Sequence, residues 1–512
     1  GEVTIKGTGE VDPAYVVEQL EIKKGQRFSQ KAIRLTEIAV ADMKLFGSID
    51  ISPQYDKARK KTEVPVLIRL APVKLRGIKA GVGSLIGSRV DAHGLVGYDD
   101  RYFLFGRRRF SADLRGGLVF YPVRVESLTS QPLTEVLEEI ELDLAFEQSA
   151  FLERKTTLEI EAVGRRHYPD LFSIPDEPRD DDNVVGYWEL DTLIGPRRRF
   201  TFSESLSLIA EQYLRVQYDV PFSYNFDEVP DGFRELLIPY LETRLKTFLP
   251  FEDDIKRQVD SLVNRGISLG LRFEAAPIPA TNTIDSALFI PQDIKIRPDL
   301  RLYIPISKDV ALAGRWTTGF LFAFNYGSTL STSVAPEPTG APGEAPPQPA
   351  DVSVADQQLL FARGFLSGGP SSNRGYGFNE IGPHRLLQFR ANNRRLTNPD
   401  IDVLEPLGGI GMWEVSGELR FRLPASLVGV VFVDASDVVE GLGAFRLDHP
   451  HLSPGLGLRL ASPVGSLRFD LGFRPAYLQR IGEFNLDIDE GGDPTNDNPL
   501  PVNVNLAIGE AI

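Results

Sequence analysis

Several segments of this chain alternate, almost without interruption, between apolar and charged residues, and this pattern limits its fold more than any other feature. In residues 138–148, Ile140, Leu142, Leu144 and Phe146 share one face of an extended chain, and four acidic residues share the other. The pattern recurs in residues 156–168, 294–304, 418–423 and 467–473. Because successive side chains of a strand point to opposite faces, each segment is predicted to be a strand with one apolar and one charged face.

The connections between the predicted strands alternate in length. Tight turns such as GPRR, PFEDD and SPVG alternate with long polar loops at residues 169–183, 214–233, 276–293, 327–410, 439–454 and 476–501. Short turns at one rim and long loops at the other are typical of an outer-membrane barrel, whereas Greek-key crossings in a sandwich would mix them. We therefore predict a mainly β chain whose sixteen antiparallel transmembrane strands form a barrel, at residues 75–87, 90–98, 107–121, 138–149, 154–168, 184–194, 198–213, 234–248, 263–275, 294–306, 309–326, 411–423, 428–438, 455–461, 465–475 and 502–511.

In such a barrel the apolar face meets lipid and the charged face lines the lumen, and closure satisfies the backbone groups that hydrocarbon cannot. The sequence contains no run of 18 apolar residues that would make a transmembrane helix. Its net charge of −15, without a basic tail, argues against nucleic acid as a partner.

No residue type with obvious catalytic or metal chemistry is clustered. The chain has no cysteine, no G-x-S-x-G segment, and a single close histidine pair, His449 and His451. The acidic loop at residues 487–498 has oxygen ligands for calcium but not EF-hand spacing, and calcium binding there stays open. We predict no enzyme, with no catalytic residue, metal or cofactor.

Residues 1–72 differ from the rest. Val3 and Ile5 mark a strand, Pro13–Leu20 and a segment from Ser29 to about Phe46 are predicted helices, and two strands follow at Ile49–Tyr55 and Glu63–Leu70. This order predicts a small α+β domain at 1–72, followed by the barrel at 73–512. No apolar leader precedes it, so we expect that a signal peptide has been removed.

The longest predicted loop, 327–410, contains two unusual segments. Residues 335–350 include six prolines and are predicted to be a disordered insertion in an external loop, the alternative being an interdomain linker that splits the barrel. In residues 365–383, seven of nineteen are glycine or proline, and Arg374 is the one arginine. If this segment folds into the lumen, Arg374 needs a buried acidic partner.

These features resemble a known family. The N-terminal module resembles a POTRA domain, and Gly368, Gly369, Arg374, Gly375 and Tyr376 resemble the sixth extracellular loop of the BamA/TamA superfamily of outer-membrane protein assembly factors. Residues 408–424, 430–436, 454–471 and 502–512 resemble that family's strands twelve to sixteen, in order. The segment GGPSSNRGYGFNEIGP favours the TamA-like branch over the BamA form, which has R-G-F.

The resemblance implies an insertase without covalent chemistry, in the outer membrane of a Gram-negative-type bacterium. Its POTRA domain would lie in the periplasm, with further such domains upstream of residue 1. Arg374 would pair with Glu418 and Asp434 on the barrel wall. The chain departs from the family at Ser436, where glycine is usual, and at Ile512, where an aromatic residue ends the last strand.

The same resemblance places a lateral seam between the first and last strands. Glycines weaken the register of a strand, and they also permit barrel curvature. The predicted seam residues are Gly77, Gly81, Gly83, Leu506 and Gly509. A poorly paired strand there can template an incoming strand.

Two arginine runs are predicted at the rim with short turns. They are either a solvated edge or a site of attraction to anionic lipid headgroups. The residues are Arg107, Arg108, Arg109, Arg197, Arg198 and Arg199.

The predicted partners are unfolded outer-membrane protein clients, outer-membrane lipid, and accessory proteins that reach the POTRA domain. The alternatives are a BamA-type central insertase, a two-partner-secretion transporter, which shares the POTRA domains and the loop arginine, and a passive porin. The N-terminal module and the loop motif speak against the porin.

Overall fold

The computed structural model describes residues 1–508 except residues 23–24, 56–62, 87–89, 122–134, 169–184, 204–205, 224–232, 251–265, 277–287, 327–358, 361, 378, 380, 391–399, 407, 425–426, 440, 446, 448–449, 463–464 and 475–501. The predictions for segment 335–350, the acidic loop 487–498, Gly509 and Ile512 lie outside the described residues.

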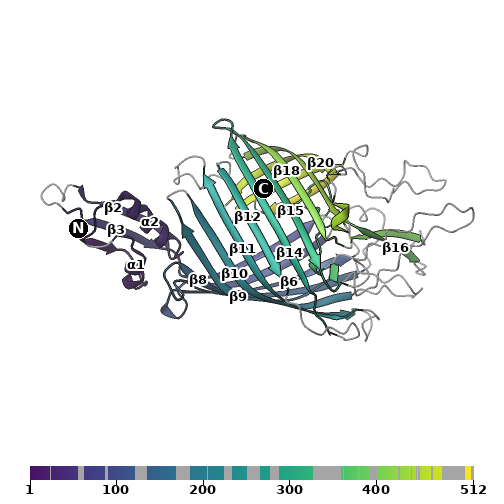
Figure 1. Ribbon diagram of the computed structural model, residues 1–512, viewed down its shortest axis with the longest axis horizontal. Helices are drawn as coiled ribbons and strands as arrows, with labels where there is room; N and C mark the ends of the chain where they lie inside the picture. Colours follow the sequence, from purple (N-terminus) through teal and green to yellow (C-terminus); the bar gives the residue numbers. More distant parts are fainter. Residues whose placement is uncertain are drawn as a thin grey trace, which may run out of the picture.

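The N-terminal residues form a three-stranded sheet, in the order β1-β3-β2, beside two helices (Figure 1). Asp12 caps the first helix by accepting a hydrogen bond from the Ala14 amide, and Ser29 caps the second through the Ala32 amide. The second helix ends at Ala41 rather than Phe46, because Lys44 has a φ of 56° and the chain turns into a strand. The elements are β1 (Val3–Lys6), α1 (Pro13–Gln19), α2 (Gln30–Ala41), β2 (Phe46–Pro53) and β3 (Val66–Pro72).

Sixteen long antiparallel strands and the two-residue β13 form a closed barrel (Figure 1). In this barrel β22 lies beside β4. This confirms the predicted fold class. The strands are β4 (Arg76–Ile86), β5 (Val90–Asp100), β6 (Arg108–Tyr121), β7 (Glu135–Gln148), β8 (Thr156–His167), β9 (Val185–Thr201), β10 (Ser207–Ser223), β11 (Glu235–Pro250), β12 (Gly266–Ala275), β13 (Leu288–Phe289), β14 (Asp293–Pro305), β15 (Val310–Ala323), β18 (Gly411–Arg422), β19 (Leu427–Val439), β20 (His451–Ser462), β21 (Gly465–Phe473) and β22 (Val502–Ile508).

The long connection after β15 does not split the barrel. Strand β15 pairs directly with β18, from Val310 opposite Phe421 to Phe320 opposite Gly411. The interdomain-linker alternative is therefore wrong. Within the connection, β16 (His384–Arg390) and β17 (Asp400–Pro406) form a separate hairpin, at the end of the barrel opposite the N-terminal sheet (Figure 1).

The two faces of the strands divide as the alternation predicts. On β7, Ile140, Leu142 and Leu144 are 47%, 42% and 37% exposed, although a soluble protein would bury such side chains. On β14, Lys295 and Arg297 lie on the charged face of the strand, which faces the lumen. No helix within the described residues is long and apolar enough to cross a membrane.

The predicted boundary between the sixth and seventh barrel strands is wrong. The GPRR segment does not turn but lies inside β9, where pairing with β10 skips Gly195 and Pro196 without a change of register. Proline lacks an amide donor, so the ladder is interrupted there but continues beyond it. The turn comes after Thr201, and β10 runs through residues 207–223, which overlap the predicted long loop 214–233.

The N-terminal sheet contacts the barrel through a barrel side chain. Tyr102, in the turn after β5, is 3% exposed and packs in the hydrophobic core of the N-terminal domain. Its hydroxyl accepts a hydrogen bond of 3.2 Å from the Asp12 amide. The two parts of the chain therefore share one core across their junction.

We predict that Tyr102→Ala weakens this junction without unfolding the barrel. Replacing a buried aromatic side chain by alanine costs roughly 3–5 kcal/mol. The connection at residues 72–75 should then be cut faster in limited proteolysis. Tyr55→Ala, at a tyrosine that is 54% exposed, is the matched control. Equal cleavage of both variants would contradict the shared core.

Candidate functional site in the barrel lumen

The segment after β15 folds back against the lumenal faces of β18 to β22. Gly368 and Gly369 have φ values of 107° and 97°, which glycine adopts without strain. Antiparallel bridges join Ser367 to Ile381 and Phe365 to Gly409, so the loop is closed at its base. The arrangement carries Arg374 to the barrel wall, where it is 0% exposed.

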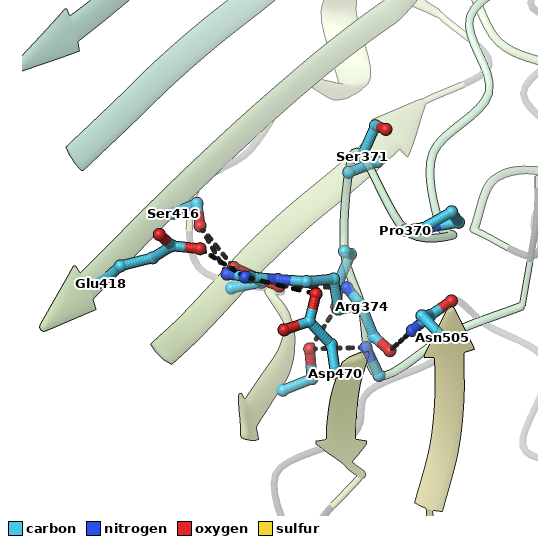
Figure 2. Close-up of polar contacts among 12 residues, drawn as sticks. Pro370, Ser371, Arg374, Ser416, Glu418, Asp470 and Asn505 are labelled. Atoms are coloured by element: carbon cyan, nitrogen blue, oxygen red, sulfur yellow. Dashed lines mark hydrogen bonds and ion pairs between the residues drawn. The ribbon is translucent and has the colours of Figure 1, made fainter. Parts of the chain in front are cut away.

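The Arg374 guanidinium binds two carboxylates on adjacent strands. Its Nε and Nη2 each donate to Asp434 of β19 at 2.8 Å, and its Nη1 donates to Glu418 of β18. The Arg374 amide also donates to Asp434, at 3.0 Å. Figure 2 shows the side chain extended toward Glu418 and Ser416. The contacts therefore join the arginine and the two acids that the sequence singled out.

An aromatic ring and the nearby carboxylates also stabilise the positive charge of Arg374. The guanidinium carbon lies 3.5 Å from the centroid of the Phe432 ring, which is a cation–π contact. Burial by itself would lower the pKa of Arg374, but Asp434 and Glu418 raise that pKa above its ordinary value. Arg374 therefore stays protonated at any physiological pH.

Arg374 and its two acids belong to a larger buried network that sequence analysis did not identify. Arg459 of β20 binds Asp470 of β21 at 2.6 Å, and Arg420 binds Glu418 at 2.7 Å. Alternation along each strand was the available signal, since residues two apart share the lumenal face. Among the described side chains the network comprises Arg374, Arg420, Arg459, Arg468, Glu418, Asp434 and Asp470.

Polar side chains fit the loop tip to the wall beside Arg374. Asn373 donates to the Ser436 hydroxyl at 3.0 Å and to the His451 carbonyl at 2.7 Å. The serine that departs from the family pattern therefore binds the loop directly. A Cβ atom at Gly375 would lie 2.2 Å from the Cβ of Ser453, so only glycine fits there.

The loop backbone also binds the last strand. Asn505 of β22 donates to the Arg374 carbonyl at 2.8 Å (Figure 2), and Asn503 donates to the Tyr376 carbonyl at 2.7 Å. The Tyr376 ring is 3% exposed and makes an edge contact with His451. One short stretch of loop thus contacts strands from β18 to β22.

A second buried arginine was missed by sequence analysis. Arg363 donates to both oxygens of Asp293, at 3.0 and 2.6 Å, and to Glu274 at 2.7 Å. Its guanidinium carbon lies 4.7 Å from the Tyr240 ring centroid. Arg363 precedes the glycine-rich motif, and nothing in its neighbouring sequence predicts burial. It binds the start of the loop to β12 and β14.

The predicted seam residues lie where the first and last strands meet. A Cβ atom at Gly77 or Gly81 would meet no atom within 4 Å, so space does not require glycine there. At Gly83 it would lie 2.6 Å from His93. Leu506 lies in β22 opposite Phe469, and Gly509 is outside the described residues.

Five of the six rim arginines contact acidic side chains. Arg107 pairs with Glu18 of α1, and Arg199 lies 3.3 Å from Asp42 at the end of α2. Three more pair within the barrel, namely Arg109 with Asp99, Arg197 with Glu159 and Arg198 with Glu153. Arg108 forms no ion pair with a described residue. Contact with lipid headgroups remains a prediction for these residues.

Within the described part of the chain, no group of histidine, aspartate and glutamate side chains is arranged to hold a metal ion.

Comparison with known proteins finds a family and a fold. The Omp85 superfamily domain matches residues 263–490. The chain is similar to BamA from Haemophilus ducreyi lacking POTRA domains 1–3, with 14% identity, a TM-score of 0.52, and coverage of 92% of this chain and 80% of that one.

CdiB from Acinetobacter baumannii has 10% identity, a TM-score of 0.56 and coverage of 94% and 71%, respectively. CdiB from Escherichia coli has 12% identity, a TM-score of 0.56 and coverage of 99% and 76%. At such identities the likeness shows a shared fold. No curated protein matches the sequence.

We predict that Arg374→Met releases the loop tip. The change leaves Asp434 without its buried cation and removes one of the cations around Glu418, which costs roughly 3–5 kcal/mol. Proteolysis within residues 365–383 should accelerate, while Arg301→Met, at an arginine with 34% side-chain exposure, should have little effect. Loop docking that survives both Arg374→Glu and Asp434→Arg would contradict the pairing.

We further predict that Arg363→Met frees the start of the loop but not its tip. The amides of Gly364 and Phe365 should exchange with solvent faster, by roughly 100-fold for a loss of about 3 kcal/mol. Exchange at Gly375 should change much less, because its contact with Ser453 remains. Equal acceleration at both ends would show that the loop is held as one unit.

Proposed function

The chain belongs, through its barrel, to the Omp85 superfamily, and on that premise we propose that it inserts β-barrel or autotransporter clients into the outer membrane. Proteins of this superfamily handle protein clients in the outer membrane. The predicted resemblance is confirmed at this level. In the proposed mechanism, the client's strand pairs with the first barrel strand at the seam, without covalent chemistry.

The observation that carries the proposal is the contrast between this seam and the other strand pairs. β4 has 11 residues and β22 has 7. β22 is hydrogen-bonded to β4, but within the described residues it is the shortest of the sixteen long strands and so offers β4 the fewest backbone partners. A strand edge that is weakly paired presents backbone donors and acceptors to an incoming strand.

The lumenal loop supports the same mechanism. The Arg374 side chain binds β18 and β19, while its carbonyl accepts a hydrogen bond from β22. The loop therefore sets the position of the last strand, β22, relative to β18 and β19. Movement of the loop tip would change how β22 meets β4.

The outer surface of β4 suits contact with lipid and client. Ile78 and Val82 are 81% and 95% exposed, so the outward face of this strand is apolar and uncovered. We place the N-terminal domain in the periplasm as a POTRA domain, where it would receive unfolded clients. The Arg-Gly-Tyr form of the loop motif supports a TamA-like protein rather than a BamA-type central insertase.

Site-directed crosslinking tests this proposal, since the chain has no native cysteine. In lipid vesicles, Val82→Cys and Leu506→Cys, made singly and together, should form disulfides with a cysteine in the terminal strand of an unfolded barrel client. Val96→Cys is the matched control, because Val96 is 59% exposed but lies on β5, which is paired on both sides.

Three outcomes would contradict insertion. A disulfide only between positions 82 and 506 indicates a permanently closed barrel. A client that crosses the vesicle membrane without becoming integrated indicates a two-partner-secretion transporter. Steady ion conductance that is insensitive to deletion of residues 365–383 indicates a passive porin.

A further inference from the structure

A cavity of about 160 Å³ lies in the lumen beside the start of the loop, away from Arg374. Strands β10, β11, β12 and β14 supply its walls, together with Ala362 and Arg363 of the loop. Five cationic side chains line it, against one carboxylate, Glu274. The cations are Arg215, Arg272, Lys295, Arg297 and Arg363.

Three of these cations are neutralised by carboxylates close to them. Arg363 binds Asp293 and Glu274, as described above. Arg215 pairs with Asp191 and lies 3.3 Å from Glu242. Arg272 lies 2.6 Å from Glu274. These groups need no further anion.

Lys295 and Arg297 differ from the other three. Lys295 donates to the carbonyls of Arg363, at 2.8 Å, and Gly364, at 3.2 Å, and lies 4.3 Å from the Phe365 ring centroid. No described carboxylate lies within 4 Å of its ammonium. The nearest carboxylate paired with Arg297 is that of Glu414, at 4.0 Å, and Glu414 also lies 3.8 Å from Arg315. Two adjacent lumenal positions on β14 therefore carry poorly compensated positive charge.

The chemistry of these two groups suits an oxyanion. An ammonium has three donors, and Lys295 uses two of them on the loop carbonyls. A guanidinium presents a planar set of donors that matches phosphate oxygens. The cavity has room for such an anion and some water, since one water molecule occupies about 30 Å³ of liquid.

We propose that this cavity is a binding site for a small oxyanion of the phosphate class, held by Lys295 and Arg297. A dianion would supply the negative charge that Lys295 and Arg297 lack at hydrogen-bond distance. Because Lys295 also holds the loop carbonyls, a bound anion stabilises the attachment of the loop to β14. The site does not depend on the proposed insertase activity.

Calorimetric titration of inorganic phosphate into the folded chain, in a phosphate-free non-ionic detergent, tests the site. Saturable binding should weaken roughly tenfold or more in Arg297→Gln, because a charge-assisted contact is lost. Arg297 forms no hydrogen bond or ion pair with a described loop residue, so this variant keeps the hydrogen bonds of Lys295 to the loop. Lys295→Met should weaken binding similarly. Arg301→Gln is the control, since Arg301 lies on the same face of β14, outside the cavity, and pairs with Asp299 at 2.7 Å.

A second titration uses an alkyl phosphate monoester in place of inorganic phosphate. If the monoester binds as tightly as inorganic phosphate, the site is assigned to a phosphate headgroup. If the monoester binds more weakly, the site is assigned to the free anion. Two results would overturn the proposal: no saturable binding of either compound to the unaltered chain, or binding that Arg297→Gln and Lys295→Met leave unchanged.

Discussion

The buried charge of Arg374 is the constraint on which the lumenal architecture depends. An arginine cannot escape burial by losing its proton, so it must be matched by carboxylates wherever the loop rests. Asp434 and Glu418 supply that match from adjacent strands, and their alignment requires the register in which Ser416 lies opposite Asp434. The position of the loop and the pairing of β18 with β19 therefore support each other.

The same segment connects parts of the barrel that are distant along the wall. Arg363 binds β12 and β14, Arg374 binds β18 and β19, and the Arg374 carbonyl receives Asn505 of β22. Because it is attached at three places, the loop is fixed inside the lumen and does not lie freely at its opening. The last strand is thereby positioned by interactions that do not involve its partner at the seam.

Charged side chains at the junction between the barrel and the N-terminal domain are also paired. The rim arginines include two that reach acidic residues of the N-terminal domain, and Tyr102 inserts into that domain's core. Exposed ion pairs contribute little individually, typically below about 1 kcal/mol, so the buried tyrosine dominates the junction. The two arginine pairs add complementary charge between the N-terminal domain and the barrel rim.

The alternation of apolar and charged residues predicted strands with one apolar and one charged face, and the alternating short and long connections favoured a barrel over a sandwich. Arg374 and its acids were found because a resemblance supplied the pairing. Sequence placed a turn at Gly195 and Pro196, whereas the strand continues to Thr201, since a wide barrel tolerates a local gap in one ladder. It could not reveal Arg363, the asparagines of β22 or the cavity beside Lys295. Those depend on which lumenal positions face one another across the barrel, and only the folded loop decides that.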